Sequence, residues 1–243
     1  MNVTTKTKLI VALDVPVYDD AVRLLAALAP LGVLFKIGNE ALYGYGERLC
    51  AEFERRGAAY FADAKLHDIP RTVAAGVRAL VRPGARIINL HALGGNDMMI
   101  AAVEAAAERA HELGIETPQI FAVTLLTSHA PEELGELGLQ GGPGENVMRL
   151  AALARDARCA GVICSTHEVR DLKGYFGTDF LTLCPGIRPT GTPHGDQRRV
   201  ATPAEATRAG ADYIVVGRPI VEAPDPIAAA RAVLAEMEAA GAR

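Results

Sequence analysis

The sequence has no excess of basic residues, no long apolar run and no paired cysteine motif, and each absence excludes a class of protein. The net charge is −4 and the pI is about 5.9, whereas a general nucleic-acid binder needs a basic stripe on its surface. No apolar run has membrane-spanning length, and Met1–Lys8 is polar, without the core of a signal peptide. We therefore expect a cytoplasmic protein that binds neither nucleic acid nor a membrane.

The four cysteines form no C-x-x-C pair; they are Cys50, Cys159, Cys164 and Cys184. Three of them lie in apolar surroundings typical of strands or helices. This pattern predicts buried free thiols rather than a zinc site.

Apolar runs of strand length alternate with helical segments along the whole chain, and 50% of the residues are hydrophobic. Predicted strands, in order, are Leu9–Leu13, Val33–Ile37, Tyr60–Lys65, Arg86–His91, Ile120–Leu126, Gly161–Cys164, Phe180–Cys184 and Tyr213–Val216. The helices that follow them are Tyr18–Leu28, Ala41–Arg56, Arg71–Val81, Met98–Leu113, Glu145–Ala157, His167–Tyr175, Pro203–Ala209 and Pro226–Ala239. Short, continuously apolar strands are typical of a parallel sheet covered by helices.

Eight strand–helix units without a linker predict an α/β protein with one domain over residues 1–243, a (β/α)8 TIM barrel. A doubly wound open sheet is the alternative fold. Its G-x-G-x-x-G fingerprint is missing after the first strand, which favours the barrel.

The segment from Phe61 to Pro70, FADAKLHDIP, places three charges at the end of a predicted strand. Asp63 and Lys65 project from one face because strand side chains alternate. Asp68 follows the strand, and Pro70 suits the first turn of a helix. By itself this pattern fits either a structural ion pair with a helix cap or a catalytic group.

Chemistry in a barrel gathers at the carboxyl ends of the strands. Residues predicted there are Asp14, Lys36, Asp63, Lys65, His91, Thr127, Arg188, Gly217 and Arg218. Buried charges need partners, so we expect the two lysines and two aspartates to alternate in sign. Gly217-Arg218 follows the eighth strand, where many barrels bind phosphate.

Two connections are unusually long. Residues Ser128–Gly144 contain a predicted short helix around Glu132–Leu137, and Pro185–Val200 joins glycine, proline and polar residues to arginines. Long loops at the active end of a barrel are often lids, although glycine and proline also suit an ordinary surface loop.

Together these residues resemble the orotidine 5'-monophosphate decarboxylase family from end to end. The segments that carry the resemblance are VALDV at Val11–Val15, FKIG at Phe35–Gly38, DAKLHDIPRTV at Asp63–Val73, VTLLTS at Val123–Ser128, PGIR at Pro185–Arg188, DQRRVATP at Asp196–Pro203 and VVGRPI at Val215–Ile220. The sequence departs from the family at insertions in the fifth and seventh connections (Glu132–Gly144 and Thr190–Gly195), and no matched position is vacant.

The resemblance implies a homodimeric carboxy-lyase that converts orotidine 5'-monophosphate to UMP in pyrimidine biosynthesis without metal or cofactor. It implies that Lys65 donates a proton and that Lys36, Asp63 and Asp68 complete the charge array, with Asp68 serving the partner's site. Asp14 and Lys36 would hold the ribose hydroxyls, helped by Thr72 from the partner, and Thr127 would contact the pyrimidine. Ile69 would reach the partner's site together with Asp68 and Thr72. The residues implied in phosphate binding are Arg188, Gln197, Gly217 and Arg218, with Gln197 on a closing loop.

Two alternatives remain open. Magnesium-dependent sugar-phosphate lyases, such as 3-keto-L-gulonate 6-phosphate decarboxylase and hexulose-6-phosphate synthase, resemble the chain at D-x-K-x-x-D but use an acidic metal ligand where this chain has Lys36. A cation there would repel a metal. The other alternative is a non-catalytic phosphate-binding barrel, since a fold does not by itself confer activity.

Overall fold

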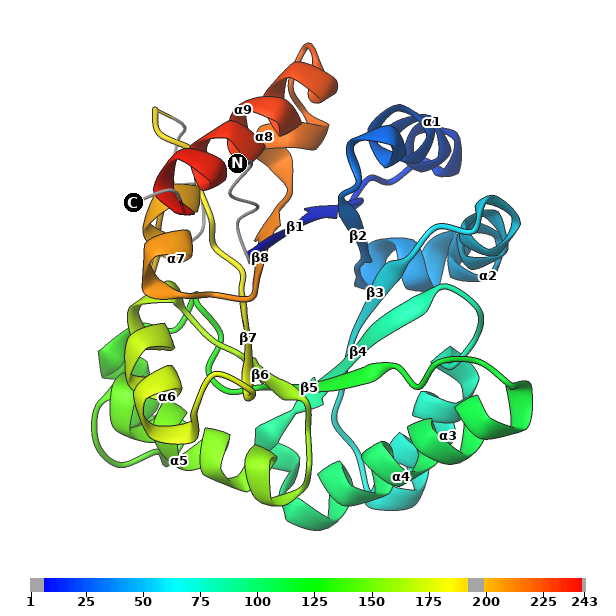
Figure 1. Ribbon diagram of the computed structural model, residues 1–243. Coiled ribbons are helices and arrows are strands. Elements are labelled where there is room, and N and C mark those ends of the chain that lie inside the picture. The colour runs from blue at the N-terminus through cyan, green and yellow to red at the C-terminus, as the bar shows by residue number, and fades with distance from the viewer. Residues whose placement is uncertain (1–6, 192–198, 242–243) are drawn as a thin grey trace.

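The eight strands close into one parallel barrel in the order in which they occur in the chain. A computed structural model describes residues 7–191 and 199–241. In Figure 1 the helices form an outer ring around the strands, and the last strand lies beside the first. The predicted (β/α)8 barrel is thereby confirmed.

The observed strands match the predicted ones closely. They are β1 (Lys8–Ala12), β2 (Leu34–Ile37), β3 (Tyr60–Leu66), β4 (Ala85–His91), β5 (Gln119–Val123), β6 (Gly161–Ile163), β7 (Leu181–Cys184) and β8 (Tyr213–Val216). The α-helices are α1 (Tyr18–Leu28), α2 (Asn39–Arg56), α3 (Pro70–Leu80), α4 (Asn96–Leu113), α5 (Pro143–Asp156), α6 (Val169–Phe176), α7 (Pro203–Ala209), α8 (Arg218–Val221) and α9 (Pro226–Gly241). Short 3₁₀ turns are η1 (Ala29–Leu31), η2 (Ala92–Gly94), η3 (Pro131–Leu134) and η4 (Thr166–Glu168).

Local chemistry explains where these elements begin and end. Pro70 opens α3, where its fixed φ suits the first turn and its missing N–H costs no hydrogen bond. Gly57 follows α2 with a φ of 61°, a left-handed conformation that glycine adopts without strain. The short helix predicted around Glu132–Leu137 is present as the shorter η3.

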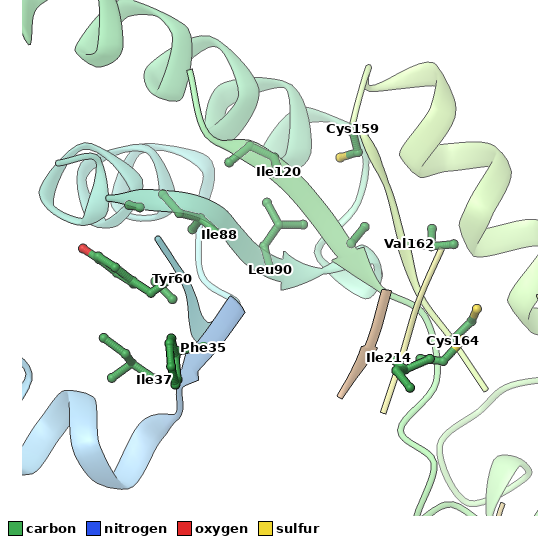
Figure 2. Packing of buried hydrophobic residues seen from close by; sticks show 14 of the residues in the cluster. Phe35, Ile37, Tyr60, Ile88, Leu90, Ile120, Cys159, Val162, Cys164 and Ile214 are labelled. Carbon is green, nitrogen blue, oxygen red and sulfur yellow. The ribbon is translucent and has the colours of Figure 1, made fainter. Parts of the chain in front are cut away.

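Because side chains alternate along a strand, each strand contributes apolar residues to two separate layers. One set faces the helices; Figure 2 shows members of it, including Phe35 and Ile37 of β2 and Ile88 and Leu90 of β4. The other set fills the inside of the barrel and includes Phe61 and Ile87. Burial of both layers stabilises the fold and leaves the carboxyl ends of the strands as the place where polar groups can gather.

All four cysteines are buried free thiols, as predicted. Among the described residues, no helix is long and apolar enough to cross a membrane.

Candidate active site

Four charged side chains form a chain of contacts at the carboxyl ends of β1, β2 and β3. Lys36 Nζ lies 2.8 Å from Asp14 Oδ2 and 3.1 Å from Asp63 Oδ2. Lys65 Nζ lies 2.5 Å from Asp63 Oδ1. The sign of charge therefore alternates from Asp14 to Lys65, as predicted from the cost of burying unpaired charges.

Burial differs along this charge array. The side chains of Asp63 and Lys36 are 9% and 10% exposed, whereas that of Lys65 is 33% exposed. The inner pair is therefore fixed among protein groups, while the Lys65 ammonium keeps access to the cavity described below.

Asn89 of β4 supports the array. Its side-chain N–H donates to Asp63 Oδ1 at 2.7 Å, and its side-chain oxygen accepts from the Lys65 backbone N–H at 2.8 Å. Lys65 has a φ of 49°, at a register shift between β3 and β4. A non-glycine residue with positive φ is uncommon and needs the surrounding structure to hold it.

Asn89 is not among the site residues predicted from the sequence. A signal was present, because Asn89 stands between the apolar Ile88 and Leu90 and shares a strand face with the inward-facing Ile87, two residues away, so it must point into the barrel.

The pKa values of the two innermost groups move in opposite directions. Burial alone would lower the pKa of the Lys36 ammonium, but the carboxylates of Asp63 and Asp14 outweigh it and raise that pKa. Burial alone would raise the pKa of the Asp63 carboxyl, but Lys36, Lys65 and hydrogen bonding together lower it. Each group is therefore held in its charged form by its neighbours.

A cavity of about 200 Å³ lies over the array. Lys36, Asp63 and Lys65 form its charged wall, and Thr127 contributes to the wall after β5. The remaining lining is mostly apolar: Phe61, Val123, Leu125, Leu126, Ser128, Ile163, Leu183, Pro185 and Val215. A flat apolar ring with a few polar edges fits a cavity of this kind.

A second cavity, of about 370 Å³, adjoins the first, since Lys36, Pro185 and Val215 line both. Arg188, Gly217 and Arg218 line it, and α8 begins at Arg218. Two guanidinium groups next to exposed backbone make a suitable site for a phosphate.

Gly38 makes room for the Asp14 end of the array. A Cβ at this position would collide with Asp14 Oδ1 and would lie 2.7 Å from Lys36 Nζ. Gly38 has a φ of −86°, so any residue could adopt its backbone conformation. The position needs glycine for space alone. Gly38 ends the FKIG motif found in the sequence, but it is not among the predicted site residues.

Three predicted site residues lie away from both cavities. Asp68, Ile69 and Thr72 are exposed, and Ile69 is 63% exposed. Asp68 Oδ1 accepts from the Ile69 N–H at 2.6 Å. Within one chain the structure therefore does not bring these residues to the array. Gln197 lies outside the described residues.

Fold and site together define a (β/α)8-barrel protein with a charged cavity and an adjoining cavity lined by two arginines. The sequence model of the orotidine 5'-phosphate decarboxylase / HUMPS family matches residues 7–233. The chain belongs to this family, as the sequence motifs predicted.

Within the family, the chain is similar to several proteins named orotidine 5'-phosphate decarboxylase. The chain is 48% identical to the orotidine 5'-phosphate decarboxylase of Moorella thermoacetica over 96% of this chain and 93% of the relative. It is 46% identical to that of Halorhodospira halophila over 99% of this chain and all of the relative. The crystal structure of orotidine 5'-phosphate decarboxylase from Lactobacillus acidophilus superposes with a TM-score of 0.84 at 37% identity, covering 95% of this chain and 99% of that one.

Proposed function

We propose that this protein decarboxylates orotidine 5'-monophosphate to UMP and carbon dioxide, a step of pyrimidine biosynthesis. Its relatives carry the name of this carboxy-lyase activity. The observation that carries the proposal for this chain is the alternating array of Asp14, Lys36, Asp63 and Lys65 beside a ring-sized cavity, with two arginines lining the adjoining cavity.

The reaction breaks the bond between C6 of the pyrimidine and its carboxylate. Carbon dioxide leaves, and the bonding electron pair stays on C6 as a carbanion with no neighbouring electron sink. A fixed cation beside C6 stabilises that charge, and a proton from the same cation completes the product. Both lysines line the cavity, but the Lys65 side chain is the more exposed, at 33% against 10% for Lys36, so we assign Lys65 as the proton donor.

Asp63 and Lys36 hold Lys65 in place. Asp63 accepts from Lys65 and Asn89 through Oδ1 and contacts Lys36 through Oδ2. An ammonium fixed before the reaction needs no reorganisation when the carbanion forms. We therefore assign Asp63 mainly to positioning rather than to repulsion of the substrate carboxylate.

The remaining contacts follow the two cavities. Thr127 lines the smaller cavity and is assigned to the pyrimidine. Lys36 lines both cavities and Asp14 the larger one, so the ribose hydroxyls are assigned to this pair. Arg188, Gly217 and Arg218 would hold the phosphate. Gln197 is assigned to the phosphate by the sequence resemblance alone.

The array also favours a reaction without a metal. The Lys36 ammonium occupies the space between Asp14 and Asp63, where a magnesium-dependent lyase of the family would need an acidic ligand and a metal. A cation in that space opposes a second cation. We expect the same decarboxylation in excess chelator.

Asp68, Ile69 and Thr72 are proposed to serve the active site of a partner subunit. Their exposure at the start of α3, with a large apolar side chain at Ile69, supports this assignment. A homodimer and a cytoplasmic location remain predictions.

The test is release of labelled carbon dioxide from carboxyl-labelled orotidine 5'-monophosphate, with and without chelator. Lys65→Ala should lower turnover by more than the ~10²–10⁴-fold typical of general acid catalysis, because the stabilising cation is lost as well. Lys173→Ala is the matched control, since Lys173 pairs with Asp212 at the opposite end of the barrel. A wild-type protein that releases no carbon dioxide would contradict the function, and a Lys65→Ala variant above about a tenth of wild-type turnover would contradict the role of Lys65.

A further inference from the structure

Arg199 joins the connections that follow three neighbouring strands. Its backbone N–H donates to the carbonyl of Thr127 at 3.3 Å, after β5. Its guanidinium donates to the Leu126 carbonyl at 3.4 Å and to the carboxylate of Glu168 in η4, after β6. Arg199 itself belongs to the connection after β7.

The pair of Arg199 and Glu168 is largely buried. The two side chains are 14% and 10% exposed. Burial raises the pKa of the Glu168 carboxyl even though Arg199 opposes the shift. Arg199 Nε is buried without a hydrogen-bond partner among the described residues. A buried ion pair with an unsatisfied donor contributes little to stability, so stability alone does not explain its presence.

The same segment is tied to the phosphate end. Two residues beyond Arg199, the Ala201 carbonyl accepts from the Arg188 N–H at 2.9 Å, and the Ala201 N–H donates to the Gly186 carbonyl at 3.4 Å. Arg188 and Gly186 line the larger cavity. Leu126 and Thr127 line the smaller one. Residues 199–201 therefore connect the walls of both cavities through direct hydrogen bonds.

We propose that Arg199, held by Glu168, is a positioning residue that fixes the ring-binding wall at Leu126–Thr127 relative to the phosphate-binding residues. This inference rests on the proposed function, and it names a residue that couples the ring-binding subsite to the phosphate-binding subsite. Binding energy from a phosphate remote from the reacting carbon raises the rate only if it also helps to orient the ring. Arg199 supplies the structural connection for that effect.

The experiment compares kcat/KM for orotidine 5'-monophosphate and for orotidine, which lacks the phosphate. In Arg199→Ala the connection is lost, and kcat/KM for the phosphorylated substrate should fall about 10²-fold, the effect of a small misplacement of catalytic groups. The value for orotidine should change much less, so the preference for the phosphorylated substrate should fall. A structural role would lower both values by the same factor and leave the preference unchanged.

Two further variants keep the test informative if Arg199→Ala folds poorly. Arg199→Lys keeps a charge beside Glu168 but lacks the planar fork, and should recover part of the lost preference. Glu168→Gln should shift the preference in the same direction as Arg199→Ala, by less. Lys173→Ala is again the control, because Lys173 and Asp212 are 14% and 8% exposed and far from both cavities. Its preference should match the wild type.

An unchanged preference in Arg199→Ala and Arg199→Lys, in a protein whose wild type is active, would overturn this inference alone. A wild type that decarboxylates neither substrate would overturn the proposed function and the inference together.

Discussion

Single atoms decide whether the charged array can form. Lys36 is buried with its ammonium between two carboxylates. A methyl group on Gly38 would collide with Asp14 Oδ1 and Lys36 Nζ. An alanine at Gly38 would have to displace one of the two charged groups. The residue with the smallest side chain is thus as much part of the site as the charged ones.

Gly38→Ala should therefore lower kcat/KM for orotidine 5'-monophosphate by about 10²-fold while the barrel stays folded, since catalysis is sensitive to misplacement by 1 Å. Steady-state kinetics and a melting curve measure the two effects. Gly174→Ala in α6 is the control, because no atom lies near the added Cβ there. Equal activity of both variants would show that the array tolerates the displacement.

At the scale of elements, the sequence predicted what depends on repeating patterns. Eight apolar runs with helical segments between them were enough to predict the barrel, and alternation along β3 correctly placed Asp63 and Lys65 together. The irregularity of β3 could not be predicted. Lys65 takes a positive φ where the β3–β4 register shifts, and there its backbone N–H donates to the side-chain oxygen of Asn89 on the neighbouring strand.

The same limit applies to contacts between distant segments. Arg199 lies 31 residues from Glu168 and 73 from Leu126. No periodicity relates such positions, and their contacts follow from the pairing of β5 with β6 and of β6 with β7, which brings the connections after these strands together. Asp68 is the opposite case: the sequence resemblance assigns it to the site of a partner subunit, and within its own chain it lines neither cavity.

Asn89→Ala tests the link between β3 and β4. Asp63 would lose a donor and the Lys65 N–H would lose its acceptor, so the variant should lose about 1–3 kcal/mol of stability and also most of its kcat. Denaturant unfolding and steady-state kinetics give the two quantities. Asn146→Ala is the matched control, because Asn146 is equally buried but bonds only to α5 and the residues before it. It should lose stability and keep kcat; a similar loss of kcat in both would contradict a specific role for Asn89.

For the molecule as a whole, the array links stability to pH. The pKa of Asp63 is lower in the folded state than in the unfolded one, so its contribution to stability is present above the unfolded value and is lost as pH falls through the folded value. The pKa of Lys36 is raised, so its contribution is present below the unfolded value and is lost as pH rises through the folded value. Between these limits the contribution of the array to the free energy of unfolding should not vary with pH.

The expected result is a melting temperature that is lower in Asp63→Asn than in wild type at neutral pH. The difference should begin to narrow below about pH 4, where the Asp63 carboxyl of the unfolded chain takes up its proton, and should close only below the lower pKa of the folded protein. Thermal melts across a pH series measure it. Asp179→Asn, at an exposed position before β7, is the control and should follow the wild type at every pH. A difference between Asp63→Asn and wild type that stays constant down to pH 2 would show that the Asp63 carboxyl is not the linked group.

The last prediction concerns assembly and tests the proposal that Asp68, which is exposed and lines neither cavity of its own chain, serves the site of a partner subunit. Lys65→Ala and Asp68→Ala subunits should each be inactive, and mixing them should form heterodimers in which one site has Lys65 from one chain and Asp68 from the other. Random pairing in an equal mixture should restore about a quarter of wild-type activity. Lys65→Ala mixed with Asp63→Asn is the matched control: both residues belong to one chain's array, so no site is rebuilt. If subunit exchange is demonstrated and the first mixture stays as inactive as the control, Asp68 serves its own chain and the shared site is wrong.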